Sequence, residues 1–287
     1  MLQIDNLEFK KLDINGLQTL VSWAKQEGWN PGKHDADTFF ATDPDGFCGY
    51  YYNGELIAGG SIVSFSGNFG FMGFFIVRAD MRGHGIGRRI WRQRKETLLS
   101  RLKPGAAIGM DGVVTMQPFY HKGGFELSFR DMRYEKTGEQ YTVSPYVNPV
   151  AERDFQHIID YDRACTGYAR DHFMKLWLSQ PDAGIFKYVE ADELKGFAVV
   201  READTGYRIG PLFADNIAIA EELYRACLAY GTGKPVYLDI PMINEEARRL
   251  VTKYEATSIF ECGRMYLATP PPANMEKVFG LTSFELG

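Results

Sequence analysis

Apolar residues in the first 65 positions switch between helical and strand spacing. After a short first strand, apolar side chains recur every three or four residues and predict a helix that ends at Gly28. These side chains are Leu17, Leu20, Val21 and Ala24. A second short helix is expected over 35–40, and the runs 47–52 and 56–65 predict two strands. The dipeptide Asn53-Gly54 between the runs is typical of a tight hairpin turn.

A third apolar run, 69–77, predicts a strand that leads directly into a glycine-rich stretch. The stretch is followed by a predicted helix over 90–102. Two more strands are expected at 106–110 and 125–134, with a short helix over 115–122 between them. The first half therefore predicts a mixed α/β unit in which the glycines connect a strand to a helix.

The second half begins with helical spacing and then repeats the order strand, helix, strand, helix, strand. The elements expected there are strands at 185–189, 196–201, 207–212, 236–240 and 264–267 and helices at 218–230 and 245–254. Residues 131–134 resemble residues 263–266, which lie 132 positions later in the chain. Residues 75–77 resemble residues 207–209 at the same separation of 132 positions. The shared order and register predict a duplicated unit.

The duplication divides the chain into two units of ordinary domain size. The first domain is predicted over 1–140 and the second over 150–287. The segment 141–149 is polar and contains two prolines, and it is predicted to be a linker.

Composition and charge argue against several classes of protein, among them nucleic-acid-binding, membrane-spanning and metal-binding proteins. A net charge of -5 gives no broad basic field, so nucleic acid is not an expected partner. No apolar run is long enough for a membrane span, and Met1–Asp5 lacks the basic-then-apolar pattern of a signal peptide. The cysteines Cys48, Cys165, Cys227 and Cys262 are scattered, without a metal-binding spacing. We therefore expect a cytoplasmic protein with reduced, mostly buried thiols and no metal.

The stretch from Arg82 to Arg88 has the features of an anion site. Glycines at 83, 85 and 87 lack Cβ atoms, so the backbone N–H groups can approach an anion closely. The helix that follows would add free N–H groups and the positive end of its dipole. The stretch matches neither the dinucleotide fingerprint nor the Walker loop, because Arg88 follows the third glycine and no Lys-Ser or Lys-Thr directly follows these glycines.

The pattern R-x-x-G-x-G, carried by Arg82, Gly85 and Gly87, resembles the acetyl-CoA motif of the GNAT superfamily of N-acetyltransferases. The resemblance covers about residues 3–135. It implies that the loop holds the pyrophosphate and that the preceding strand pairs with the pantetheine arm. The cofactor-binding residues so implied are Phe75, Ile76, Val77, Arg82, Gly83, His84, Gly85, Ile86, Gly87 and Arg88.

Two further segments, 27–32 and 279–287, make nearly the whole chain similar to a bacterial subgroup of tandem GNAT proteins, the YitH-type acetyltransferases. The implied fold class is α/β (α+β), with two tandem GNAT-like units. Each unit has a mixed, mostly antiparallel sheet flanked by helices, and the second unit is degenerate. Asp215 stands where the first half has its arginines, so the second unit is not expected to bind CoA. It is expected to cover the acceptor side of the first unit or to form a pocket of its own.

The resemblance assigns Tyr120, in the segment 119–125, to the protonation of the departing CoA thiolate. The general base stays open. Many relatives carry a glutamate on the strand before the glycine loop, but 69–77 contains no carboxylate. Asp111 is the nearest candidate, although it would serve equally as a turn residue with Gly112. A water chain, His84 or His121 are the alternatives.

The sequence thus predicts direct acetyl transfer from acetyl-CoA to an amine of a small molecule or peptide in a ternary complex. Trp29 and Asn30 are the expected acceptor-binding residues. Neither nucleic acid nor a membrane is an expected partner, and the protein would act as a monomer or homodimer. The rival hypotheses are a regulatory module that senses acyl-CoA without chemistry and an enzyme that transfers a longer acyl chain.

Overall fold

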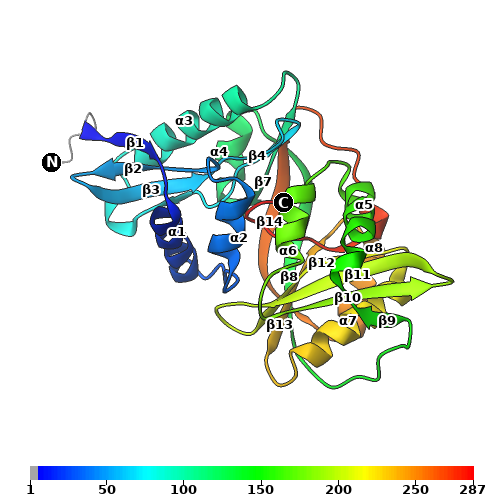
Figure 1. Ribbon diagram of the computed structural model, residues 1–287. Helices are drawn as coiled ribbons and strands as arrows, with labels where there is room; N and C mark the ends of the chain where they lie inside the picture. The colour runs from blue at the N-terminus through cyan, green and yellow to red at the C-terminus, as the bar shows by residue number, and fades with distance from the viewer. Residues whose placement is uncertain (1–5) are drawn as a thin grey trace.

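The computed structural model describes residues 6–287 (Figure 1). Met1–Asp5, on which the signal-peptide expectation rests, lie outside the described residues. The elements of the first half are β1 (Glu8–Lys11), α1 (Ile14–Gln26), α2 (Asp35–Thr42), β2 (Phe47–Tyr52), β3 (Glu55–Ser61), β4 (Val63–Phe65), β5 (Phe69–Phe71), β6 (Ile76–Val77), α3 (Ile86–Arg101), β7 (Ala107–Val113), α4 (Gln117–Lys122) and β8 (Glu126–Thr137).

The second half continues the alternation of strands and helices. Its elements are β9 (Val147–Pro149), α5 (Phe155–Thr166), α6 (Asp171–Trp177), β10 (Ala183–Glu190), β11 (Glu193–Glu202), β12 (Tyr207–Ala214), α7 (Ile217–Tyr230), β13 (Pro235–Pro241), α8 (Glu245–Lys253), β14 (Thr257–Leu267) and β15 (Val278–Gly280). The predicted mixed α/β architecture is confirmed. None of the helices within 6–287 has the length and apolar character needed to cross a bilayer.

Two predictions of single strands, over 56–65 and 69–77, are wrong. The first run divides into β3 and β4, and the second into β5 and β6. β3 and β6 pair with each other in a sheet of order β1-β2-β3-β6, whereas β4 and β5 pair in a larger sheet. Both parts of each run are largely buried, so apolar spacing alone could not show where the chain changes sheets.

The second change of sheet occurs at Gly73 and Phe74. Phe74 has a φ of 48°, which is unusual for a residue with a side chain. A Cβ atom on Gly73 would lie 2.2 Å from the carbonyl oxygen of Glu285, so only glycine fits there. The chain therefore bends away from β5 where a segment from the far end of the sequence packs against it.

The larger sheet has the order β4-β5-β7-β14-β8-β13-β12-β11-β10-β9, with β15 added to β12. β14, the last long strand of the second half, lies between β7 and β8 of the first half (Figure 1). β8 in turn pairs with β13 of the second half from Asp131 to Thr137. Each half therefore has its last long strand in the sheet of the other, and one sheet runs through both.

Apolar packing also joins the halves. Phe39 of α2 stacks on Trp177 of α6 with ring centroids 6.0 Å apart. Both side chains are fully buried in a hydrophobic cluster that takes residues from both halves. A contact of this kind is stabilised by the removal of apolar surface from water.

Buried ion pairs cross the same boundary. Arg133 of β8 donates two hydrogen bonds to Asp239 of β13, at 2.6 and 2.9 Å, and Arg208 of β12 donates a third at 2.9 Å. Burial by itself would raise the pKa of Asp239, but Arg133 and Arg208 outweigh it and hold that pKa below its usual value. Arg201 of β11 pairs similarly with Asp35 of α2. Charge in this interior is therefore paired across the two halves.

We expect Asp239→Ala to lower the free energy of unfolding by about 3–5 kcal/mol, because two buried guanidinium groups lose their shared carboxylate. Urea denaturation measures the change. Asp45→Ala is the control, since Asp45 pairs with Lys11 at an exposed position and should leave stability close to that of the wild type. Equal stability of the two variants would show that Asp239 does not hold the halves together.

Candidate functional site

A cavity of about 610 Å³ lies where the two halves meet. One side of its wall, the loop side, comes from the region of β6 and the glycine loop. The loop-side residues are Phe75, Ile76, Val77, Met81, Arg82, Gly83, Gly85, Ile86 and Gly87. The other side, the tail side, brings together residues that are distant in sequence. The tail-side residues are Trp29, Phe74, Asp111, Arg133, Phe260, Cys262, Phe284 and Glu285.

The loop side has the geometry of an anion cradle. Gly83 and Gly85 have φ values of 83° and 80°, which only glycine adopts without strain. Apart from the adjacent residues, no heavy atom of the described part of the chain lies within 4 Å of a Cβ built on either glycine, so the space beside them is open. Gly85 is the N-cap of α3, and the helix begins at Ile86 rather than at the predicted residue 90. Its first N–H groups are therefore available to an anion at the cavity.

β6 supplies a second feature of the loop side. It is the edge strand of the smaller sheet, and within residues 6–287 it pairs only with β3, Val77 opposite Ala58 and Ile76 opposite Gly59. Its free edge can pair with an extended ligand chain. Arg82 donates a hydrogen bond to the Val77 carbonyl oxygen at 2.9 Å and pairs with Glu27, so its side chain is held beside this strand.

The structure does not bring every predicted loop residue to the cavity wall. His84 is exposed, and its Nδ1 lies 2.9 Å from the carbonyl oxygen of Arg82. Arg88 is exposed on the first turn of α3. Neither lines the cavity, whereas the other eight predicted cofactor residues do.

Tyr120 of α4 also lines the cavity and is only 4% exposed. Its ring packs on Trp91 at 4.8 Å between centroids and on Phe75 at 6.5 Å. A Cβ on Gly112 would lie 2.9 Å from the Tyr120 ring, so this glycine leaves room for the tyrosine. Burial raises the pKa of Tyr120 to about 12, so the hydroxyl keeps its proton at neutral pH.

Of the two predicted acceptor residues, Trp29 lines the tail side and Asn30 does not. The Asn30 side chain accepts from the Thr205 amide at 2.8 Å and donates to the Thr205 carbonyl at 3.0 Å. It therefore fastens the first half to the second. Sequence reasoning missed Arg133, Phe260, Phe284 and Glu285, since strand spacing gives no sign that they meet; the only signal was the family-like final segment.

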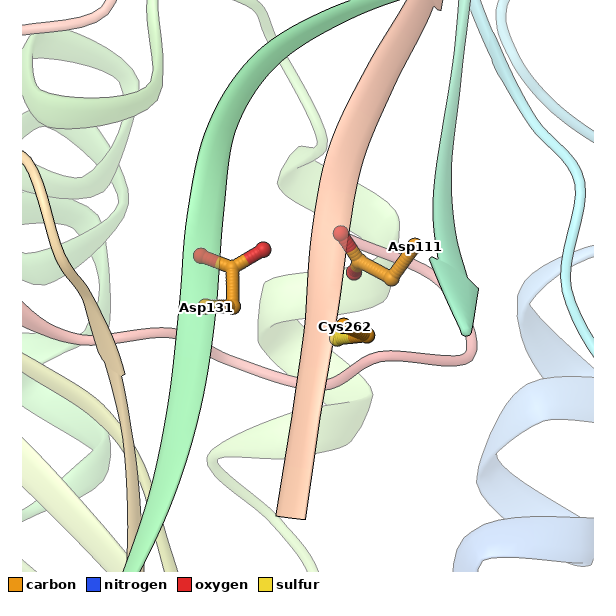
Figure 2. A group of neighbouring side chains, drawn as sticks. All are labelled: Asp111, Asp131 and Cys262. Carbon is orange, nitrogen blue, oxygen red and sulfur yellow. The ribbon is translucent and has the colours of Figure 1, made fainter. Parts of the chain in front are cut away.

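Asp111, at the end of β7, lies beside Asp131 of β8 and Cys262 of β14 (Figure 2). One carboxylate oxygen of each aspartate and the Cys262 sulfur all lie within 4.8 Å of one another. Both Asp111 oxygens accept from Arg264 of β14, at 2.6 and 2.9 Å. A divalent cation could bind all three residues only after Arg264 released Asp111.

Asp131 lies beside a second buried carboxyl group, and neither of its own oxygens has a hydrogen-bond partner among the described residues. Burial raises the pKa of Asp131 well above its usual value, and the Asp111 carboxylate raises it further. Burial also raises the pKa of Asp111, but Arg264 opposes that shift. We place the proton on Asp131, because Arg264 stabilises the negative charge on Asp111. Asp111 is thus held as an ion-paired carboxylate in the wall.

The raised pKa of Asp131 makes stability depend on pH. Above about pH 4 the unfolded chain ionises this group while the folded chain keeps its proton, so the free energy of unfolding falls as pH rises toward the folded pKa. Asp131→Asn imitates the protonated form. We expect its stability relative to wild type to increase with pH by up to about 1.4 kcal/mol per unit. Urea denaturation from pH 4 to pH 8 measures this difference.

Asp160→Asn, on the exposed face of α5, is the control and should show no such trend. A stability difference between Asp131→Asn and wild type that stays constant over the whole pH range would mean that Asp131 is ionised in the folded protein.

Comparison with known proteins shows which protein family the two halves resemble. Residues 14–125 match the model of the acetyltransferase (GNAT) family, and residues 158–280 match a second acetyltransferase (GNAT) domain model. Together the two matches span most of the chain, which belongs to the GNAT family and carries two GNAT domains in tandem. The chain is a GNAT acyltransferase, and the predicted fold class is confirmed.

Individual relatives agree with this class. A holothin acyltransferase of Pseudoalteromonas sp. (strain SANK 73390) is 29% identical over 280 residues, which cover 97% of this chain and 94% of the relative. A putative acetyltransferase from Pyrococcus horikoshii shares the fold with a TM-score of 0.84 at 19% identity, over 100% of this chain and 98% of that chain. A tandem GNAT protein from the clavulanic acid biosynthesis pathway has a TM-score of 0.65 at 11% identity, and the match covers 91% of this chain and 98% of that chain.

Proposed function

We propose that this acyltransferase moves an acetyl group from acetyl-CoA to an amine of a small molecule. One observation carries the proposal: a single cavity is lined by the glycine cradle, by β6 at the edge of its sheet, by the buried Tyr120 and by an aromatic wall. A pyrophosphate, an extended thioester arm, a departing thiolate and an acceptor each need one of these features. The relative named for acylating holothin, which matches nearly the whole chain, supports a small-molecule acceptor.

The residues of the loop side fit the donor. Backbone N–H groups of Gly83–Gly87 would hold the pyrophosphate, and β6 would pair with the pantetheine arm. Tyr120 would donate its hydroxyl proton to the departing thiolate. Its pKa of about 12 keeps that proton in place before the reaction, so proximity rather than acidity must drive the transfer. The finer assignment to the YitH-type subgroup rests on segments 27–32 and 279–287 and stays part of this proposal.

We expect Gly85→Ala to weaken acetyl-CoA binding about tenfold or more. A side chain at a φ of 80° strains the N-cap of α3 by about 1–2 kcal/mol and fills space beside the cradle. Isothermal titration calorimetry measures the affinity. Gly105→Ala is the matched control, because Gly105 has a φ of 82° and equally open surroundings but does not line the cavity. Equal weakening by both variants would refute a specific role for the cradle.

We expect Tyr120→Phe to reduce the rate of CoA release about 100-fold while the affinity for acetyl-CoA stays close to that of the wild type. The ring would remain packed on Trp91, so only the proton donor is lost. A thiol-detection assay with an amine library measures turnover. If no amine releases CoA and the variant behaves as the wild type does, the acyl-CoA sensor becomes the better hypothesis.

A further inference from the structure

The structure points to a carboxylate site for the acceptor amine that is built by the final segment, 281–287. This segment lies between the two halves rather than on the surface. Arg170 of the second half donates to the carbonyl oxygen of Gly287 at 2.6 Å and to the Thr282 hydroxyl at 2.6 Å. The Leu281 amide donates to the Asp239 carbonyl at 2.7 Å. These contacts fix Phe284 and Glu285 in the cavity wall.

Glu285 has an unused acceptor atom. The residue is 3% exposed and lines the cavity, and its Oε1 accepts a long hydrogen bond of 3.3 Å from Arg208. Its Oε2 is buried and has no hydrogen-bond partner among the described residues. A buried carboxylate oxygen without a donor is costly, which favours a ligand group that supplies one. Both Asp111 oxygens, by contrast, are already taken by Arg264.

The position of Glu285 also suits the reaction. Its backbone abuts Gly73, at the bend between β5 and β6. The run 69–77 contains no carboxylate of its own. The final segment therefore places the backbone of an acidic residue, Glu285, beside the bend that leads into β6, and the run around β6 has no carboxylate of its own.

The wall around Glu285 indicates which amines fit. Phe260 and Phe284 lie 6.1 Å apart between centroids, and both contact the Arg133 guanidinium, at 5.7 and 5.2 Å. Arg133 also donates to the Trp29 carbonyl at 2.9 Å, so the rings and the guanidinium form one fixed group. Apolar, flat surfaces favour a flat apolar body over a flexible polycation.

We propose that Glu285 binds the acceptor amine and takes its proton, and that the acceptor carries a single amine on a flat, apolar body. This inference rests on the proposed acetyl transfer. When the amine nitrogen bonds to the acyl carbon, the C–S bond breaks. Before the attack, Glu285 takes one proton from the bound ammonium group and passes it to solvent; after the attack the second N–H proton goes to Glu285, and the thiolate receives the Tyr120 proton. Exchange with solvent then restores both residues.

The test compares Glu285→Gln with the wild type, using tryptamine as the flat amine and spermidine as the polycation. The variant keeps an oxygen for Arg208 but cannot accept a proton. We expect at least tenfold weaker tryptamine binding to the free protein by calorimetry and about 100-fold lower kcat/KM. Acetyl-CoA affinity should be unchanged. The reduction in kcat/KM caused by Glu285→Gln should become smaller as pH rises, because more of the tryptamine is then already deprotonated in solution. Glu276→Gln, an exposed change in the preceding turn, is the control.

The outcomes separate this inference from the proposed function. Acetylation of tryptamine that does not depend on Glu285 would overturn the role of Glu285 and leave acetyl transfer standing. Preference for spermidine over tryptamine would overturn the acceptor class. Acetyl-CoA binding with no CoA release from any amine would overturn the proposed function itself. Should Glu285→Gln fail to fold, Phe284→Ala tests the same wall, and it should lower the selectivity for tryptamine at least tenfold.

Discussion

The exchange of final strands between the halves governs the rest of this structure. β14 takes the place beside β7, and β8 takes the place beside β13, so neither half can complete its sheet alone. Backbone hydrogen bonds left unmade at a buried strand edge are costly, and the exchange satisfies them only when both halves are present. The cavity then lies across a continuous sheet, which fixes its two sides relative to each other.

A row of buried charge follows from that exchange. Strands β7, β14, β8, β13, β12 and β11 lie side by side and carry the charged groups on neighbouring positions. Those groups are Asp111, Arg264, Asp131, Arg133, Asp239, Arg208 and Arg201, joined by Asp35 and Glu285. Four arginines meet five carboxyl groups, and a proton on Asp131 balances the charge. Desolvation would make any one of these groups unfavourable alone, so their pairing specifies how the halves assemble.

Within this frame the two domains have different tasks. The first supplies the glycine cradle, the edge strand β6 and Tyr120. The second, through β14 and the final segment, supplies the aromatic and acidic part of the wall. Asp215, which stands where the first half has arginines, pairs with Lys277 and accepts a hydrogen bond from Tyr161 at 2.7 Å. That carboxylate contributes to packing in the second half.

The chain's alternation of helical and strand spacing determined most of the elements, and the motif around Arg82, Gly85 and Gly87 determined the family. Both are local signals, because helix periodicity and loop glycines depend on residues that are close in sequence. The splitting of 56–65 and 69–77 between sheets, and the meeting of Trp29, Arg133, Phe260 and Glu285, were decided by tertiary structure. Both the splitting of the runs and the meeting of these residues depend on the order of the strands in the sheets. The same apolar spacing is compatible with several strand orders.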